Sequence, residues 1–155
     1  MLRLAAYQPD IAANLGAMIR TTACLGVSLD VIEPCGFPFS VKALRRAAMD
    51  YADIADICRH DDWTSFLNCH NGARIVLLST RGTRSLWNFN FNKGDIVMVG
   101  RESAGVPDAV HDQVGASVYL PMPGGGRSLN VAITAGIALA EGLRQCGHWS
   151  QEAGH

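Results

Sequence analysis

The sequence predicts a single α/β domain built on a mainly parallel, six-stranded sheet with helices on both faces. Short apolar segments alternate with segments of helical periodicity along almost the whole chain, which is the pattern of repeated β-α-β units. The 155 residues are 48% hydrophobic and 17% charged. This length and composition suit one ordered domain with a sizeable core, so we assign residues 1–155 to a single domain.

The first half of the chain alternates apolar segments with amphipathic ones. Leu15, Met18 and Ile19 give one helix its apolar face, and Gly26 ends that helix because glycine readily adopts a left-handed conformation. The expected strands are residues 2–7, 30–33 and 53–58, and the expected helices are residues 14–25, 41–50 and 62–69.

The second half continues the alternation. Residues 83–93 are irregular, and we expect an extended edge or loop there. The final helical segment is apolar nearly all round, so it must be buried on several sides, in the core or at a subunit interface. The expected strands are residues 74–79, 95–99 and 118–120, and the expected final helix is residues 128–144.

Three glycine-bearing loops follow strands of the second half, at residues 80–82, 100–107 and 121–127. In parallel sheets, ligands bind beyond the carboxyl ends of the strands, where such loops meet. The stretch 120–130, read as LPMPGGGRSLN, has few bulky side chains and exposes its main chain. We therefore predict a site at this edge for a flat polar ligand that lies against backbone.

Common phosphate-binding and hydrolase motifs are excluded by their spacing. Gly124 and Gly126 are followed by Leu129, which does not complete a dinucleotide fingerprint, and Gly105 precedes Val106 rather than the lysine of a P-loop. Ser103 stands one residue away from the position of a hydrolase nucleophile.

Three other motifs occur in order and resemble the signature of the SpoU branch of the SPOUT methyltransferases. They are Asn14-x-Gly16-x-x-x-Arg20, Gly100-Arg101-Glu102-Ser103-Ala104-Gly105-Val106-Pro107 and Arg127-Ser128-Leu129-Asn130-Val131-Ala132. Within that branch the chain is most similar to the small TrmL-type tRNA (cytidine/uridine-34)-2'-O-methyltransferases, including the segment Tyr7-Gln8-Pro9-Asp10-Ile11. Arg101 stands where close relatives often carry proline, and this departure is expected to alter either cofactor affinity or the RNA contact, to which Arg101 could add a phosphate contact.

The resemblance implies an enzyme that transfers a methyl group from S-adenosylmethionine to the ribose 2'-hydroxyl of wobble nucleotide 34, a cytidine or a modified uridine, in the tRNA anticodon loop. It also implies a homodimer through the C-terminal helix and a deep C-terminal trefoil knot, which our reading of the residues does not itself predict. Two alternatives remain, a 2'-O-methyltransferase acting on another tRNA or rRNA ribose and a catalytically silent RNA-binding protein. The implied cofactor-binding residues are Leu78, Thr80, Gly100, Leu120, Met122 and Ser128.

Four polar residues of the motifs are the candidate catalytic group. Arg20 is expected to orient the ribose or a neighbouring phosphate and to stabilise alkoxide character, because a guanidinium is a poor base; its alternative is a surface role or a pair with Glu102. Glu102 is a proton acceptor, an anchor for Arg20 or a structural carboxylate. Asn14 and Asn130 either cap helices or contact substrate, and Ser128 is expected both to cap the final helix and to meet the cofactor.

A formal net charge of −1 gives no overall attraction for RNA, so a local basic face must hold it. The pair Asp50-Tyr51 is a candidate for recognising anticodon bases or stacking on them, with a helix terminus as the alternative. The candidate phosphate contacts are Lys42, Arg45, Arg46, Arg81, Arg84 and Arg127, and for each of them a solvated charged surface is the alternative.

The five cysteines include no C-x-x-C pair, which fits reduced thiols and predicts no metal site; Cys69 beside His70 is too little for zinc. No apolar segment reaches the roughly 20 residues that cross a bilayer. The chain begins with a strand-like segment rather than an export signal. We therefore expect a cytoplasmic protein without membrane contact.

Overall fold

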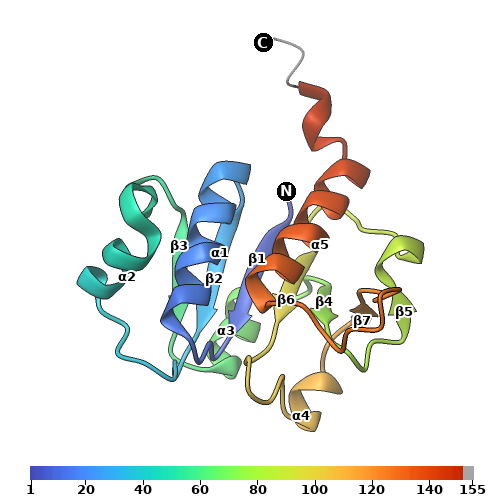
Figure 1. Cartoon of the computed structure of the whole chain (residues 1–155), viewed down its shortest axis with the longest axis horizontal. Helices are drawn as coiled ribbons and strands as arrows, with labels where there is room; N and C mark the ends of the chain where they lie inside the picture. The colour runs from blue at the N-terminus through green and yellow to red at the C-terminus, as the bar shows by residue number, and fades with distance from the viewer. Residues whose placement is uncertain (152–155) are drawn as a thin grey trace.

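The computed structural model describes residues 1–151, apart from the side chains of residues 41, 44, 45, 47, 49, 52, 150 and 151. An α/β fold with one parallel sheet and helices on both of its faces is confirmed (Figure 1). The strands are β1 (Arg3–Tyr7), β2 (Ser28–Ile32), β3 (Ile57–His60), β4 (Ile75–Leu78), β5 (Arg84–Ser85), β6 (Ile96–Val99) and β7 (Ala116–Tyr119). Their order in the sheet is β3-β2-β1-β6-β4-β7-β5, and every pairing between them is parallel.

The predicted count of six strands is wrong, because the described residues form seven. The additional strand, β5, is a two-residue segment that pairs with β7 inside the stretch predicted as an extended edge or loop. The third strand also lies later than predicted, at Ile57–His60 instead of 53–58. Its start is delayed because Met49–Asp53 continue the preceding helix as a tighter 3-10 turn, η1.

The four predicted helices lie close to their expected positions, and the short helix at Asp108–His111 was not predicted. Gly26, with φ 62°, ends the first one as expected. The α-helices are α1 (Ala12–Leu25), α2 (Val41–Ala48), α3 (Trp63–Cys69), α4 (Asp108–His111) and α5 (Val131–Gln145), and the remaining 3-10 turns are η2 (Leu86–Asn88) and η3 (His148–Gln151). None of the helices in residues 1–151 combines the length and apolar character that crossing a membrane requires.

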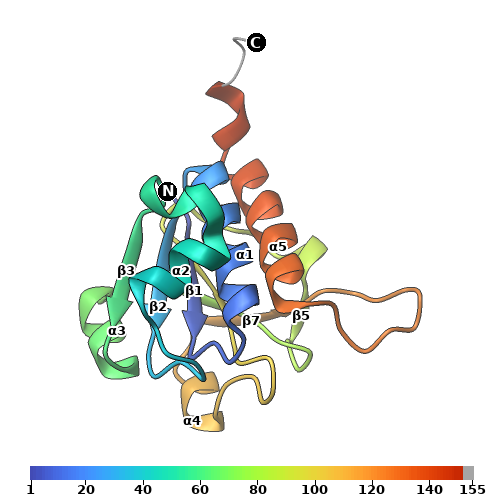
Figure 2. The ribbon, with the colours of Figure 1, turned by 60° about the vertical axis from the view of Figure 1, so that its left-hand side comes forward.

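Helix α5 begins three residues later than predicted, and Ser128 does not cap it. The cap is Asn130, whose Oδ1 accepts hydrogen bonds from the backbone N–H groups of Ala132 and Ile133 at 2.9 and 3.4 Å. Residues 120–130 form a long loop that projects from the body of the molecule (Figure 2). Ser128 therefore lies in this loop and not in the helix.

The core has two parts, one on each face of the sheet, because side chains alternate along the strands. Leu4 of β1 packs on the face covered by α1 and α5, with Met18 and Leu139. On the other face, Met98 of β6 packs with Phe66 of α3 and Val110 of α4. Figure 2 shows α1 and α5 side by side on their face.

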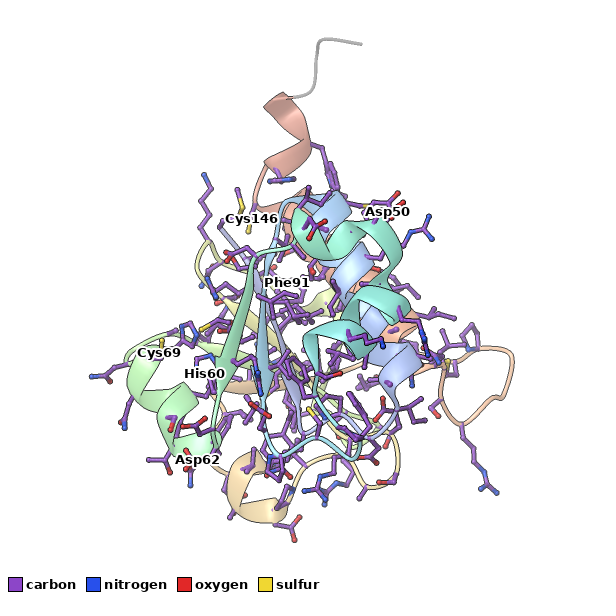
Figure 3. The ribbon with its side chains drawn as sticks, turned by 90° about the vertical axis from the view of Figure 1, so that its left-hand side faces the viewer. Asp50, His60, Asp62, Cys69, Phe91 and Cys146 are labelled. Carbon is purple, nitrogen blue, oxygen red and sulfur yellow. The ribbon has the colours of Figure 1, made fainter. Side chains whose placement is uncertain are left out.

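A buried ionic cluster ties together the edge of the sheet far from β7. The Asp30 carboxylate accepts hydrogen bonds from Arg3 Nε at 2.8 Å and from the Nε2 atoms of His60 and His70 at 2.7 and 2.9 Å. Figure 3 shows His60 beside α3, whose ends are marked by Asp62 and Cys69. Burial raises the pKa of Asp30, but the bonds from Arg3, His60 and His70 outweigh it, and the net pKa lies below its usual value.

Candidate active site

A cavity of about 740 Å³ lies at the carboxyl ends of β4, β6 and β7, along the lower edge of the sheet in Figure 1. Its walls come from residues 77–81, 99–102, 104–106, 119–122 and 126–131, with Ile11, Asn14 and Thr134. The three glycine-bearing loops therefore meet where the parallel topology predicted, at one edge of the sheet.

All six predicted cofactor-binding residues line this cavity; their role in binding stays a prediction. They are Leu78, Thr80, Gly100, Leu120, Met122 and Ser128. They come from the ends of three neighbouring strands, so the loops present both main-chain groups and short side chains to the same space.

Gly100 shapes the wall because its position leaves no room for a side chain. An added Cβ would lie 2.6 Å from the carbonyl carbon of Gly105, which itself has φ +63°. The loop closes between them through two reciprocal backbone hydrogen bonds of 2.9 Å that join Arg101 and Gly105. The chain thus folds back on itself directly after β6 and turns its backbone toward the cavity.

Three of the four predicted catalytic residues form one hydrogen-bonded chain at the edge of the cavity. Glu102 Oε1 accepts from Asn14 Nδ2 at 3.1 Å, and Asn14 Oδ1 accepts from Asn130 Nδ2 at 2.8 Å. Glu102 Oε2 accepts from the backbone N–H of Asp10 at 2.8 Å. Every link uses a different atom, so the orientation of both amides is fixed.

The structure excludes helix capping by Asn14 and confirms it for Asn130, while contact with substrate stays a prediction for both. Asn14 lies inside α1, which has Ile11 at its N-cap position, so Asn14 does not cap that helix. Asn130 both caps α5 and binds Asn14. The two asparagines and Glu102 join the three sequence motifs into one structural unit.

Arg20 stands apart from the other predicted catalytic residues, because it does not line the cavity. It lies six residues beyond Asn14, which is about 9 Å further along a helix. Its side chain is exposed, and its guanidinium carbon lies 4.9 Å from the centre of the Tyr51 ring. The structure therefore pairs Arg20 with a predicted RNA-binding residue.

The predicted RNA-binding cations fall into two groups. Lys42 and Arg46 are exposed on α2, which packs against α1; Arg45 is on the same helix, but its side chain lies outside the described residues. Arg81 and Arg127 line the cavity. Arg81 also bonds to Asp108 at 3.1 Å, and Arg84 is exposed on β5.

Gln8 and Asp10, which follow β1, belong to the site although we did not predict them as site residues. Asp10 Oδ2 accepts hydrogen bonds from the Ser103 N–H and hydroxyl, and Gln8 Oε1 accepts one from Arg101 Nη2. Gln8 has φ 44°, a left-handed conformation unusual for a side chain of its type. The only sequence signal was their place in the Tyr7–Ile11 segment that supported the family resemblance.

Comparison with known proteins gives a consistent result over nearly the whole chain. The model of the SpoU rRNA Methylase family matches residues 1–140. A tRNA (cytidine(34)-2'-O)-methyltransferase from Beijerinckia indica is 49% identical over 146 residues, which are 93% of this chain and 91% of that protein. The protein of the same name from Escherichia coli K12 is 35% identical over 150 residues, or 96% of each chain.

A solved structure described as giving structural insights into the 2-OH methylation of C/U34 on tRNA has the same fold. It superposes with a TM-score of 0.88 at 42% sequence identity and covers 94% of this chain and 95% of its own. The similarity thus extends through the cavity loops and the final helix.

Proposed function

The chain belongs to the SpoU rRNA methylase family, and from this premise we propose that it is a tRNA 2'-O-ribose methyltransferase acting on wobble nucleotide 34, a cytidine or a modified uridine. Relatives named for this reaction match over more than nine-tenths of both chains. The observation that carries the proposal is the bonded group Asn14, Glu102 and Asn130 at the edge of a cavity walled by three strand-end loops.

The cavity fits the methyl donor S-adenosylmethionine. Its volume is within the roughly 300–1,000 Å³ of small-molecule sites. Main-chain groups at Leu78, Gly100 and Leu120 would hold the adenosine, with Ser128 beside them, since N–H and C=O groups match the edges of a purine. When bound, the cofactor supplies a methyl group that is already activated by its attachment to a sulfonium.

The residues of the protein then have to handle the acceptor ribose. Both oxygens of Glu102 accept hydrogen bonds, which favours its role as the anchor that orients Asn14. Arg20 lies further along α1 than Asn14, outside the cavity wall, with its guanidinium over the Tyr51 ring. In our proposal Arg20 orients the ribose or a neighbouring phosphate and stabilises negative charge that develops on the 2'-oxygen, while its own proton stays in place.

Recognition of RNA rests on two basic regions in this proposal. Lys42 and Arg46 on α2 lie next to the helix that carries Arg20, and Arg81 and Arg127 lie at the cavity. Phosphate contacts of this kind position a nucleic acid without reading its sequence. Tyr51, half-buried beside Arg20, is then available to an anticodon base at its edge.

We also propose that the active form is a cytoplasmic homodimer. A groove between α1 and α5 is lined by small and apolar side chains, among them Ala17, Gly136 and Ile137. Ile133 in this groove is 56% exposed, although the neighbouring Ala132 and Ala135 of the same helix are buried. A second copy that packs on this face would bury it, and the predicted C-terminal knot would bring the same helix beside the cofactor loops.

The test is methyl transfer by the purified full-length protein from labelled S-adenosylmethionine to tRNA transcripts. We expect one 2'-O-methyl group, mapped to nucleotide 34. A transcript with a 2'-deoxynucleotide at that position is the matched control and should accept none. Methylation of rRNA instead, which the family description keeps as the second candidate, would overturn the substrate assignment and keep the chemistry.

A further inference from the structure

Arg101 is a partly buried cation at the cavity that forms no ion pair with a carboxylate of the described residues. It lies directly after Gly100 and lines the cavity wall. Among the residues that the structure describes, its side chain hydrogen-bonds only to the neutral Gln8 amide, and its Nε is buried without any hydrogen-bond partner. Such an arrangement costs free energy unless an anion arrives to compensate it.

Glu102 follows Arg101 directly and Asp10 lies two residues after Gln8, and neither carboxylate bonds to the Arg101 guanidinium. Glu102 accepts from the Asp10 N–H and from Asn14, and Asp10 accepts from Ser103. Arg81, by contrast, has Asp108 as its partner. Among the described residues Arg101 thus forms no ion pair with a carboxylate, and unlike Arg127, which also lines the cavity but is exposed, it is partly buried.

The direction of the Arg101 side chain indicates which ligand it serves. In the sheet, β6 lies between β1 and β4. The predicted cofactor wall comes from β4, β6 and β7, whereas Arg101 reaches in the opposite direction, to Gln8 at the end of β1. That side of the cavity carries Asn14 and the helix with Arg20, where we place the acceptor RNA.

We propose that Arg101 binds a phosphate group of the RNA strand beside the acceptor nucleotide, and that Gln8 positions its guanidinium. The inference rests on the proposed function for the identity of the anion as an RNA phosphate. Gln8 suits this task because its Oε1 accepts from Arg101, its Nε2 bonds to the Glu33 carbonyl at 3.4 Å and its backbone is held in the left-handed region. A neutral amide orients the cation without cancelling its charge.

The experiment measures the affinity of unmodified tRNA transcripts as a function of salt for four variants. Arg101→Met should weaken binding about tenfold at low salt and reduce the slope of log K against log salt by roughly 0.7–0.9, the value for one phosphate contact. Gln8→Glu should act similarly, because a carboxylate would neutralise Arg101 in place. Arg101→Lys should keep most of the salt slope but weaken tRNA binding, because the positive charge remains while the bidentate geometry of the guanidinium is lost.

Lys93→Met is the matched control. It removes the same charge from an exposed position before β6, at the opposite end of the sheet from the cavity, and should leave both quantities unchanged. Binding of S-adenosylmethionine, measured by calorimetry, should be the same for wild type, Arg101→Met and Gln8→Glu.

Two outcomes would overturn the inference. One is a tRNA affinity and salt slope that Arg101→Met leaves at the wild-type values; the other is a loss confined to S-adenosylmethionine affinity, which would place Arg101 on the donor. The proposed function is tested separately, by the position of the methyl group in the wild-type product. If that position is not nucleotide 34, the binding experiment still shows whether Arg101 contacts a phosphate.

Discussion

Asn14 and Asn130 lie 116 positions apart in the sequence, and their side-chain amides share a hydrogen bond of 2.8 Å. The bond connects the inside of α1 to the first turn of α5, and through Asn14 it reaches Glu102 in the loop after β6. Asn130 thus has two separable tasks: its oxygen caps a helix and its amide nitrogen holds Asn14 in one orientation.

The two tasks can be separated by substitution. Asn130→Asp keeps an oxygen for the N–H groups of Ala132 and Ile133, so unfolding free energy should stay within about 0.5 kcal/mol of wild type. It also removes the N–H group that Asn130 donates to Asn14. The Asn14 oxygen then faces a carboxylate in either orientation of its amide, that of residue 130 or that of Glu102. Methyl transfer should therefore fall about tenfold or more. Asn130→Ala should lose activity and also about 1–2 kcal/mol of stability. Urea unfolding and single-turnover transfer measure both; full activity of Asn130→Asp would contradict the role of the bond.

Arg20→Ala tests the acceptor side of the proposed mechanism. Removing a donor that stabilises charge in the transition state should lower kcat about a hundredfold or more. Affinity for S-adenosylmethionine should stay nearly unchanged, because Arg20 is outside the cavity wall. Tyr51→Leu should cost less, about two- to fivefold, since a cation-π contact is worth roughly 0.5–1 kcal/mol. Unchanged turnover in Arg20→Ala would remove this arginine from the mechanism.

Ile133→Asp tests the proposed dimer. A carboxylate on the rim of the α1/α5 groove would have to be buried without a partner, which costs more than the apolar contact it replaces. We expect a monomer in analytical ultracentrifugation, with the fold intact by circular dichroism. The control is Ile54→Asp, the same change at another exposed isoleucine, 68% accessible and outside the groove. If both variants sediment as the wild type does, this face is not the interface.

Asp30 gives the protein a predictable response to acid. The pKa of Asp30 is lower in the folded protein than in the unfolded chain, where it is near 3.9. The stabilisation by ionised Asp30 is therefore fully present above this unfolded-state pKa. It is lost as the pH falls through the lower pKa of the folded state. Asp30→Asn should destabilise by about 3 kcal/mol at neutral pH, because it leaves Arg3 without its partner. The difference from wild type in urea unfolding should shrink below about pH 4. Asp61→Asn, an exposed change nearby in sequence, should have little effect at any pH.

The place of the site could be predicted from sequence, because the carboxyl ends of parallel strands meet at one edge and three of those ends carry glycine-bearing loops. The partners of its side chains could not be predicted in this way. Whether Asn14 caps a helix or reaches Glu102 depends on a helix start two residues earlier and on a contact across 88 positions. No local pattern contains that information.

The same limit explains the errors at Ser128 and β5. Ser128 and Asn130 are both good capping residues, and the choice between them is set by where the projecting loop returns to the body of the protein. Strand β5 has only two residues, too few to show a period of two, and it exists because β7 offers it a partner. Tertiary contacts decided both cases.

Two glycines of the loops after β6 and β7, Gly100 and Gly124, differ in the space around them. Gly100→Ala would place a Cβ 2.6 Å from the Gly105 carbonyl carbon, so the loop that forms one wall of the cavity must move. We expect S-adenosylmethionine affinity to fall at least tenfold, with loss of about 1–3 kcal/mol of stability. Gly124→Ala is the matched control, since an added Cβ there meets nothing within 4 Å and the residue does not line the cavity. Calorimetric titration and thermal unfolding of both variants measure the effect. Wild-type affinity in Gly100→Ala would mean that the close approach of Gly100 and Gly105 does not shape the donor site.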